Sequence, residues 1–401
     1  MTQTYSQQTL QVKDQEQRIA LRAWAKAGYR GSIIAGTGFG KSRCGVMALG
    51  EMLRRVEGDG LLLVPTVQLQ DQFREEFFKW GYDDVLDRVE ILCYASAHKI
   101  KGRTFAVTVA DEVHLGLSPI YREIFSNNEH KMLLCMTATM PEEPEYKVLL
   151  VNMAPPVYVI TLDQCVQKGL VAPYNIKCVA VDLTAEEKKA YKAANNMFVH
   201  YKYKLGQFDA FDRANAILAS PHTASAEDKK NAALFYKAIR DRKEVVQKAY
   251  NKIVYTGMIC AVKDVKTLTF AGTNEFTDEM ASHLINSGIK AAAYHSTMKT
   301  SLRKKALQSF KDNEVRVLCS TKALNQGYDI PDAQLGIICG LDSKALQMIQ
   351  RVGRLLRLSK SDKIAEVAIL YVRDSQEEKW LMNAIKNLSN ITWIDDISSY
   401  I

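Results

Sequence analysis

The sequence predicts an α/β protein of two doubly wound parallel-sheet domains in tandem, the second of which carries a helical insertion. Three observations favour this fold. Short apolar runs typical of buried strands alternate with longer amphipathic stretches typical of helices. The chain has 401 residues, which is more than one ordinary domain needs. The alternation stops once, in a helix-rich segment with many lysines and tyrosines, and resumes at Lys266.

Composition narrows the class of protein further. An apolar content of 47% is that of a globular protein, and no apolar run approaches the roughly 18 residues that a membrane helix needs. Residues 1–14 are polar and lack a signal-peptide pattern. The eight cysteines contain no C-x-x-C pair, so we expect buried free thiols in a reducing compartment such as the cytoplasm. The formal charge of +8 fits a polyanionic partner.

The stretch 35–42 follows the phosphate-binding loop pattern G-x-x-x-x-G-K-[ST], with alanine at its first position. It lies between a strand-like and a helix-like run, so backbone N–H groups and a helix N-terminus converge on an anion there. We expect Lys41 to reach the outer phosphates of a nucleotide and the Ser42 hydroxyl to bind Mg²⁺. The expected nucleotide contacts in this loop are Gly36, Thr37, Gly38, Gly40, Lys41 and Ser42. The alternative is a glycine-rich turn without a ligand.

Gln17 lies upstream of this loop, on a helix expected over 12–28. Its side-chain amide offers one donor and one acceptor together, which is the pairing that an adenine edge requires. The alternative is an ordinary solvated glutamine.

An acidic pair, Asp111 and Glu112, directly follows the strand expected over 105–110. The carboxyl ends of parallel strands line the crevice where open α/β sheets bind ligands. We therefore expect Asp111 to hold Mg²⁺, and Glu112 to orient and deprotonate an attacking water. The alternative is that these carboxylates only cap a helix.

The expected domains are residues 1–157 and 158–401, with a helical insertion over about 184–259 in the second. The lysines of the insertion could meet phosphates, and Tyr201, Tyr203, Phe208 and Phe211 could stack on bases. Alternatively, the lysines form a solvated helix face and the aromatic residues form a core.

The segment 350–357 reads QRVGRLLR. Arg354 and Arg357 are three residues apart and so share one face of a helix. Two permanently charged guanidinium groups in this arrangement suit the γ-phosphate of a nucleotide that is bound elsewhere. A basic helix that faces nucleic acid or solvent is the alternative.

Taken together and in this order, the stretches from Gln17 to Arg357 resemble the motifs of the superfamily 2 helicases. Residues 111–114 resemble a DEVH version of motif II, and 350–357 closely resemble motif VI. The resemblance implies two RecA-like domains that bind ATP and Mg²⁺ between them. Further implied nucleotide contacts and catalytic residues come from the second domain: Gly327, Asp329, Gln350, Arg354 and Arg357.

The remaining motifs imply contacts with nucleic acid and coupling of ATP state to domain closure. The implied nucleic-acid contacts are Pro65, Thr66, Gln72, Tyr94, Ser96, Thr273, His295 and Thr321. The implied coupling residues are His114, Thr137 and Thr139.

Within the superfamily, the DEVH box and the compact QRVGR-x-x-R are similar to the DNA translocases that include XPB, RecG-like enzymes and the phage branch-migration helicase UvsW. The resemblance implies a small phage-type, monomeric ATPase of the bacterial or phage-infected cytoplasm. It would move on DNA and remodel duplex, forked or branched structures in repair and recombination. Two alternatives remain: an RNA helicase on the same motor core, and an ATP-switched nucleic-acid clamp without processive unwinding.

Overall fold

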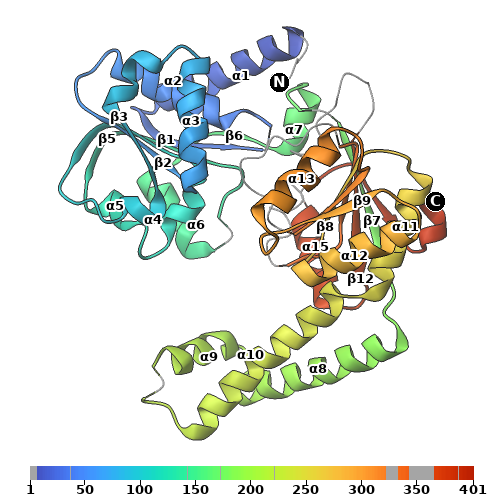
Figure 1. The fold of residues 1–401 in the computed structure, drawn as a ribbon. Coiled ribbons are helices and arrows are strands. Elements are labelled where there is room, and N and C mark those ends of the chain that lie inside the picture. Colours follow the sequence, from blue (N-terminus) through green and yellow to red (C-terminus); the bar gives the residue numbers. More distant parts are fainter. Residues whose placement is uncertain are drawn as a thin grey trace. The chain divides into compact units, whose positions relative to one another are not determined.

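The computed structural model describes residues 7–36, 38–141, 143–171, 173–220, 222–321, 333–342, 365–386 and 388–401. These residues form two compact units, one up to Pro173 and the other from Tyr174 onward (Figure 1). The boundary expected after residue 157 lies inside β6, a strand that pairs with β1 of the first unit. Nowhere in the described ranges is a helix long and apolar enough to cross a membrane.

The first unit is built on a parallel sheet with the strand order β3-β2-β4-β5-β1-β6. The interior strand β2 is buried along its whole length, because apolar clusters cover both faces of the sheet. This two-sided burial explains the continuous apolar runs in the sequence. The strands are β1 (Arg30–Ala35), β2 (Gly60–Val64), β3 (Val89–Cys93), β4 (Thr104–Ala110), β5 (Glu129–Thr137) and β6 (Pro156–Ile160).

Helices cover the two faces of this sheet and carry the segments that follow its strands. One apolar cluster includes Trp24 of α1 and Phe73 of α3, and the other includes Leu117 and Leu150. The helices are α1 (Gln7–Lys26), α2 (Lys41–Leu53), α3 (Val67–Lys79), α4 (Tyr94–Ala97), α5 (Glu123–Ser126), α6 (Pro144–Met153) and α7 (Leu162–Gln167), with 3₁₀ turns η1 (Asp83–Arg88) and η2 (Val113–Leu117).

The second unit contains a parallel sheet with the order β13-β7-β12-β11-β8-β10-β9. The tandem α/β fold predicted from the sequence is therefore confirmed. The strands are β7 (Tyr174–Val181), β8 (Thr267–Phe270), β9 (Ala291–Tyr294), β10 (Val317–Ser320), β11 (Leu335–Ile338), β12 (Ala365–Val372) and β13 (Ile391–Ile394). Sequence analysis did not anticipate β13, which pairs with β7 at the edge of the sheet.

The helices packed on this second sheet are α11 (Tyr250–Val262), α12 (Asn274–Asn286), α13 (Thr300–Lys311) and α15 (Gln376–Ile385), with the 3₁₀ turn η4 (Ile397–Ser399). Helix α11 belongs to the body of the unit, because Ile253, Ile259 and Cys260 lie in the core of the sheet. The part of the expected insertion that extends away from the sheet therefore ends before α11.

Three helices project from the second unit and form what we call the arm (Figure 1). The arm has a small core of its own around Phe235, which stacks on Phe198 and meets Phe211 edge-on. A capping box between Thr184 and Glu187 fixes the start of the first arm helix. The arm consists of α8 (Ala185–Lys204), α9 (Ala210–Ala219) and α10 (Ala226–Gln247).

All eight cysteines are buried free thiols, as the sequence predicts. Burial raises the pKa of the Cys44 thiol to about 12, so this cysteine stays protonated and behaves as a small apolar side chain.

Candidate active site

The phosphate-binding loop connects the end of β1 to the start of α2. Gly38 and Gly40 have φ angles of 87° and 92°, a backbone conformation that residues with a side chain rarely adopt. A Cβ atom at Gly36 would lie 3.1 Å from the backbone of Leu162, so this position also has little room. The N-terminal turn of α2 thus points its backbone N–H groups at the inside of the loop.

Lys41 is the first residue of α2, and its side chain is buried. Its Nζ atom donates a hydrogen bond to the carbonyl oxygen of Ala35, at a distance of 2.9 Å. The ammonium group therefore lies where β1 ends and the loop begins. This is the position that a cation for outer phosphates requires.

Gln17 is buried against the loop and is not a solvated surface residue. Its Nε2 atom donates to the carbonyl oxygen of Phe39 at 2.8 Å, and its Oε1 atom accepts from Nη1 of Arg43 at 2.7 Å. A Cβ atom at Gly40 would lie 2.3 Å from the same Nε2 atom. The amide of Gln17 thus fastens α1 to the loop, and adenine recognition by Gln17 stays a prediction.

Arg43 extends this support, because its guanidinium group also binds Asp14 and lies 4.2 Å from the ring centroid of Trp80. Burial alone would raise the pKa of Asp14, but hydrogen bonds from Arg18 and Arg43 outweigh burial and lower that pKa. No sequence pattern pointed to Arg43, Trp80 or Asp14, since each is an ordinary residue until the fold brings them together.

Phe39 occupies an unusual position for an aromatic residue, inside the phosphate-binding loop. Its ring is fully buried and lies 5.7 Å from the ring of Tyr158. The hydroxyl group of Tyr158 donates to Glu16 on α1 at 2.6 Å. Phe39 therefore anchors the outer side of the loop in the core of the first unit.

The acidic pair follows β4, at the same edge of the sheet as the loop after β1. Asp111 is buried; its backbone N–H donates to Leu63 at 2.9 Å, and its carbonyl accepts from the Tyr94 hydroxyl at 2.9 Å. Burial raises the pKa of Tyr94 well above its usual range, so this hydroxyl remains a donor. Sequence analysis assigns Tyr94 to nucleic acid; the buried ring corrects this, because it supports the backbone of Asp111 instead.

Glu112 has a left-handed backbone conformation with φ of 46°, which redirects the chain between β4 and η2. Its Oε2 atom lies 3.5 Å from Nδ1 of His114. The same nitrogen lies 3.2 Å from Oγ1 of Thr137, and that hydroxyl donates to the carbonyl of Thr139 at 3.0 Å. The structure thus brings Glu112 together with the three residues expected to act in coupling.

The donor set of Ser42 and Asp111 fits Mg²⁺, which binds through few protein oxygens and completes its shell with phosphate oxygens and water. Among the residues that the structure describes, there is no group of three or more His, Cys, Asp or Glu side chains that could hold a metal.

The expected nucleic-acid contacts of the first unit follow β2 and β3. Thr66 begins α3, and its Oγ1 atom is buried with no hydrogen-bond partner in the described part of the chain. Pro65 beside it is half-buried, whereas Gln72 and Ser96 are exposed. These four residues are accessible or unsatisfied, as ligand contacts require.

The second unit brings three expected contacts to the carboxyl ends of the neighbouring strands β8, β10 and β9. The Thr273 hydroxyl accepts from the N–H of Phe276 and so caps α12. His295 lies 2.8 Å from Thr297 and 2.9 Å from Asp278, so both ring nitrogens are engaged. Thr321 is buried directly after β10. The remaining expected site residues lie outside the described residues: Thr37, Gly327, Asp329, Gln350, Arg354 and Arg357.

Comparisons with known proteins match both halves of the chain. Residues 9–142 match the family "Type III restriction enzyme, res subunit", and residues 248–359 match "Helicase conserved C-terminal domain". The chain is 29% identical to the DNA 3'-5' translocase XPB2 of Sulfurisphaera tokodaii over 365 residues, which cover 86% of this chain and 78% of that protein.

Two further similarities are more limited. The chain is 30% identical over 124 residues to a probable ATP-dependent RNA helicase of Methanocaldococcus jannaschii, which covers 31% of this chain and 33% of that protein. The crystal structure of the Pyrococcus furiosus Hef helicase domain superposes with a TM-score of 0.60 at 17% identity, and covers 92% of this chain and 97% of that domain. At this identity the Hef structure shows a shared fold.

Proposed function

We propose that this chain, an ATP-hydrolysing superfamily 2 helicase, is a DNA translocase that remodels duplex, forked or branched DNA. The observation that carries the proposal is the arrangement at one edge of the first sheet. There the phosphate-binding loop follows β1, and the acidic pair and His114 follow β4. Thr137, which lies within hydrogen-bond distance of His114, is the last residue of β5 and is bonded to Thr139 just after it. The choice of DNA is supported by the similarity to a DNA translocase over 86% of the chain.

In this proposal Lys41 binds the outer phosphates of ATP, and Ser42 and Asp111 hold Mg²⁺. The metal, when bound, neutralises charge on the phosphates. Glu112 orients the attacking water and accepts its proton, since its carboxylate lies on the turn that leaves β4. Arg354 and Arg357 stabilise the charge that develops on the transferred phosphoryl group. Gln350 is a third proposed catalytic residue, and Gly327 and Asp329 are proposed nucleotide contacts.

Coupling of hydrolysis to movement would begin at His114. Its Nδ1 atom lies 3.5 Å from Oε2 of Glu112 and 3.2 Å from Oγ1 of Thr137. A change in charge at the nucleotide therefore changes the interactions of His114, which also contacts Thr137 at the end of β5. Pro65, Thr66, Gln72, Ser96, Thr273, His295 and Thr321 are the proposed contacts with the nucleic-acid backbone.

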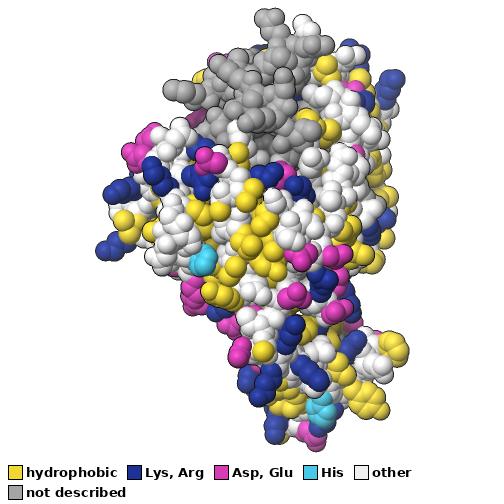
Figure 2. Space-filling view, turned by 90° about the vertical axis from the view of Figure 1, so that its right-hand side faces the viewer, with side chains coloured by type: hydrophobic (Ala, Val, Ile, Leu, Met, Phe, Trp, Pro, Cys, Tyr) yellow, Lys and Arg dark blue, Asp and Glu magenta, His cyan; other side chains and the backbone are white. Residues whose placement is uncertain are grey.

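The arm is the proposed element that recognises the DNA structure. Phe208 and Tyr203 are 90% and 74% exposed, and Lys202 and Lys204 flank Tyr203 in the sequence. Figure 2 shows hydrophobic side chains together with Lys and Arg side chains on the arm. Exposed aromatic rings among cations are suited to stack on bases at a strand junction.

An RNA helicase on the same motor core is the second candidate, favoured by the similarity to a probable RNA helicase over 31% of the chain. The expected contacts reach phosphate and sugar more than bases, so they separate DNA from RNA poorly.

The rate of ATP hydrolysis against a panel of nucleic acids tests this proposal. The panel contains no nucleic acid, single-stranded DNA, blunt duplex, forked DNA and single-stranded RNA, with the variant Glu112→Gln as the blank. We expect strong stimulation by forked or duplex DNA and little by RNA. Equal or greater stimulation by RNA would contradict the assignment to DNA.

A further inference from the structure

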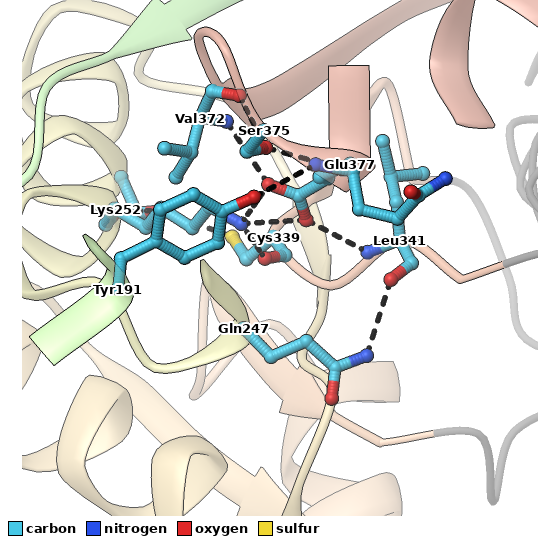
Figure 3. Close-up of polar contacts among 10 residues, drawn as sticks. Tyr191, Gln247, Lys252, Cys339, Leu341, Val372, Ser375 and Glu377 are labelled. Carbon is cyan, nitrogen blue, oxygen red and sulfur yellow. Dashed lines mark hydrogen bonds and ion pairs between the residues drawn. The ribbon is translucent and has the colours of Figure 1, made fainter. Parts of the chain in front are cut away.

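A buried ion pair lies at the base of the arm, where the body of the second unit begins (Figure 3). Nζ of Lys252 on α11 is 2.8 Å from both carboxylate oxygens of Glu377 on α15, and both side chains are 0% exposed. Lys252 also donates to the carbonyl of Cys339 at 2.8 Å. Glu377 accepts from the backbone N–H groups of Leu341 and Val372 at 3.1 and 3.0 Å.

This pair holds the backbone segment that follows β11. The Cys339 carbonyl is bound by the cation and the Leu341 N–H by the anion, so the two charges fix the peptide groups on either side of Gly340. Buried ion pairs contribute little net stability but impose one arrangement, because an unpaired buried charge is costly. In the sequence, the segment 339–342 leads directly to residues 343–364, which include Arg354 and Arg357.

Gln247, the last residue of α10, joins the arm to the same segment. Its Nε2 atom donates to the carbonyl oxygen of Leu341 at 3.1 Å. The side chain also packs on Gly272, where a Cβ atom would lie 2.8 Å from Cδ of Gln247. Gly272 precedes Thr273, a proposed nucleic-acid contact. Gln247 therefore touches two functional segments from one end of an arm helix.

One close packing and one further hydrogen bond connect other segments to this junction. A Cβ atom at Gly340 would lie 2.5 Å from the backbone nitrogen of Gly272, so the segments after β8 and β11 are in direct contact. The other long arm helix also reaches the network, because the hydroxyl of Tyr191 on α8 accepts from the N–H of Gln376 at 3.2 Å. Helix α10 has 22 residues, and a helix of that length is about 33 Å long. A displacement of the distal end of α10 is thus carried along this helix to the junction.

We propose that Gln247 is a positioning residue that transmits the engagement of DNA by the arm to the segment preceding Arg354 and Arg357. This inference rests on the proposed function, since it assigns a route by which a DNA structure on the arm sets the rate of ATP hydrolysis. The hydrogen bond from Gln247 to Leu341 connects the arm to this segment. The Lys252–Glu377 pair holds the neighbouring peptide groups in place.

The variant Gln247→Met tests the proposal, because methionine keeps the length and packing of the side chain but cannot donate to Leu341. The matched control is Gln308→Met on α13, where the same change removes only surface hydrogen bonds to Asp312. Loss of one neutral hydrogen bond predicts a decrease of about three- to tenfold in the ATPase rate at saturating forked DNA. The rate without DNA and the half-stimulating DNA concentration should equal those of Gln308→Met.

A double-variant cycle separates transmission from a merely structural effect. Phe208→Ser removes an exposed aromatic ring of the arm, and with it the contact with the fork that the proposed function assigns to this ring. In that background, Gln247→Met should lower the stimulated rate no further, because no signal remains to be transmitted. Additive losses in the double variant, or an equal loss of basal and stimulated rates in Gln247→Met, would overturn the inference. If the wild-type protein is not stimulated by any nucleic acid, the proposed function itself has failed; if it is stimulated and Gln247→Met matches the wild type, only this inference has failed.

Discussion

The two units support the carboxyl ends of their strands in different ways. In the first unit, neutral groups make the direct contacts with the functional loops: the amide of Gln17 binds the phosphate-binding loop, and the hydroxyl of Tyr94 binds the backbone of Asp111. In the second unit, a buried pair of charges holds the segment after β11, and its two members are 125 residues apart in the sequence. In the first unit, the functional loops are therefore held by residues that are close to them in the sequence. In the second unit, the segment after β11 is held by residues from distant parts of the chain.

The largest effect should come from removing the cation of the first unit. Lys41→Ala leaves the loop without its ammonium group, and we expect ATP turnover to be abolished because the outer phosphates lose their cation. The measurement is steady-state release of phosphate at saturating ATP and DNA. Lys79→Ala, at an exposed lysine of α3, is the control and should retain wild-type turnover. Full residual turnover in Lys41→Ala would mean that another loop holds the nucleotide.

Removing the proposed base should separate binding from hydrolysis. Glu112→Gln keeps the shape of the side chain but cannot accept a proton, so we expect turnover to fall by about a hundredfold or more. Binding of a fluorescent ATP analogue should be unchanged. A variant that retains turnover would place the base elsewhere, and one that loses ATP binding would make Glu112 a nucleotide contact.

The difference between the two units predicts that the free energy of unfolding of the second unit is the more sensitive to loss of a single charge. Lys252→Met leaves Glu377 buried without its partner, and we expect a loss of about 3–5 kcal/mol in the free energy of unfolding. The measurement is unfolding in urea, followed by circular dichroism.

The matched control is Lys248→Met, one turn earlier, which removes ion pairs of a partly exposed lysine with Glu244 and Glu275. Such surface pairs contribute about 1 kcal/mol or less. Equal destabilisation by the two variants would contradict the claim that the buried pair supports the second unit more strongly than surface ion pairs do.

The smallest effect should come from Tyr94→Phe, which removes the hydroxyl that binds the carbonyl of Asp111. One neutral hydrogen bond corresponds to about 0.5–1.5 kcal/mol, so we expect a reduction of a few-fold in the ATPase rate. Tyr236→Phe removes a hydroxyl contact with Asn215 in the arm and serves as the control. A selective loss of DNA binding in Tyr94→Phe would restore the interpretation of Tyr94 as a nucleic-acid contact.

The candidate site of the first unit can be proposed from the sequence, because its residues form two contiguous stretches. The loop at 36–42 and the pair at Asp111 and Glu112 each follow a strand whose apolar pattern is plain. The burial of Gln17 and of Tyr94 could not be predicted, since each depends on contacts that form only when strands and helices pack together. Lys252 and Glu377 gave no signal either, because a lysine and a glutamate on helices ordinarily face solvent.

The end of the chain shows the same limit. No helix or strand is predicted from the sequence for the short segment after Asp374. In the structure it supplies α15, which bears Glu377, and β13, which extends the second sheet. Pairing with β7 and burial of Leu381 and Ile394 decide these elements, and tertiary contacts of this kind are invisible to local propensity.

The central claim is that ATP hydrolysis at Lys41, Asp111 and Glu112 drives movement on DNA. Displacement of a labelled strand from forked DNA tests it most directly, with wild-type protein, with Glu112→Gln and with a non-hydrolysable ATP analogue. We predict that only the wild-type protein with ATP displaces the strand, and that neither Glu112→Gln nor the wild-type protein with the analogue does so. Hydrolysis that is stimulated by the fork, but without displacement of the strand, would contradict the claim and identify the protein as an ATP-switched clamp.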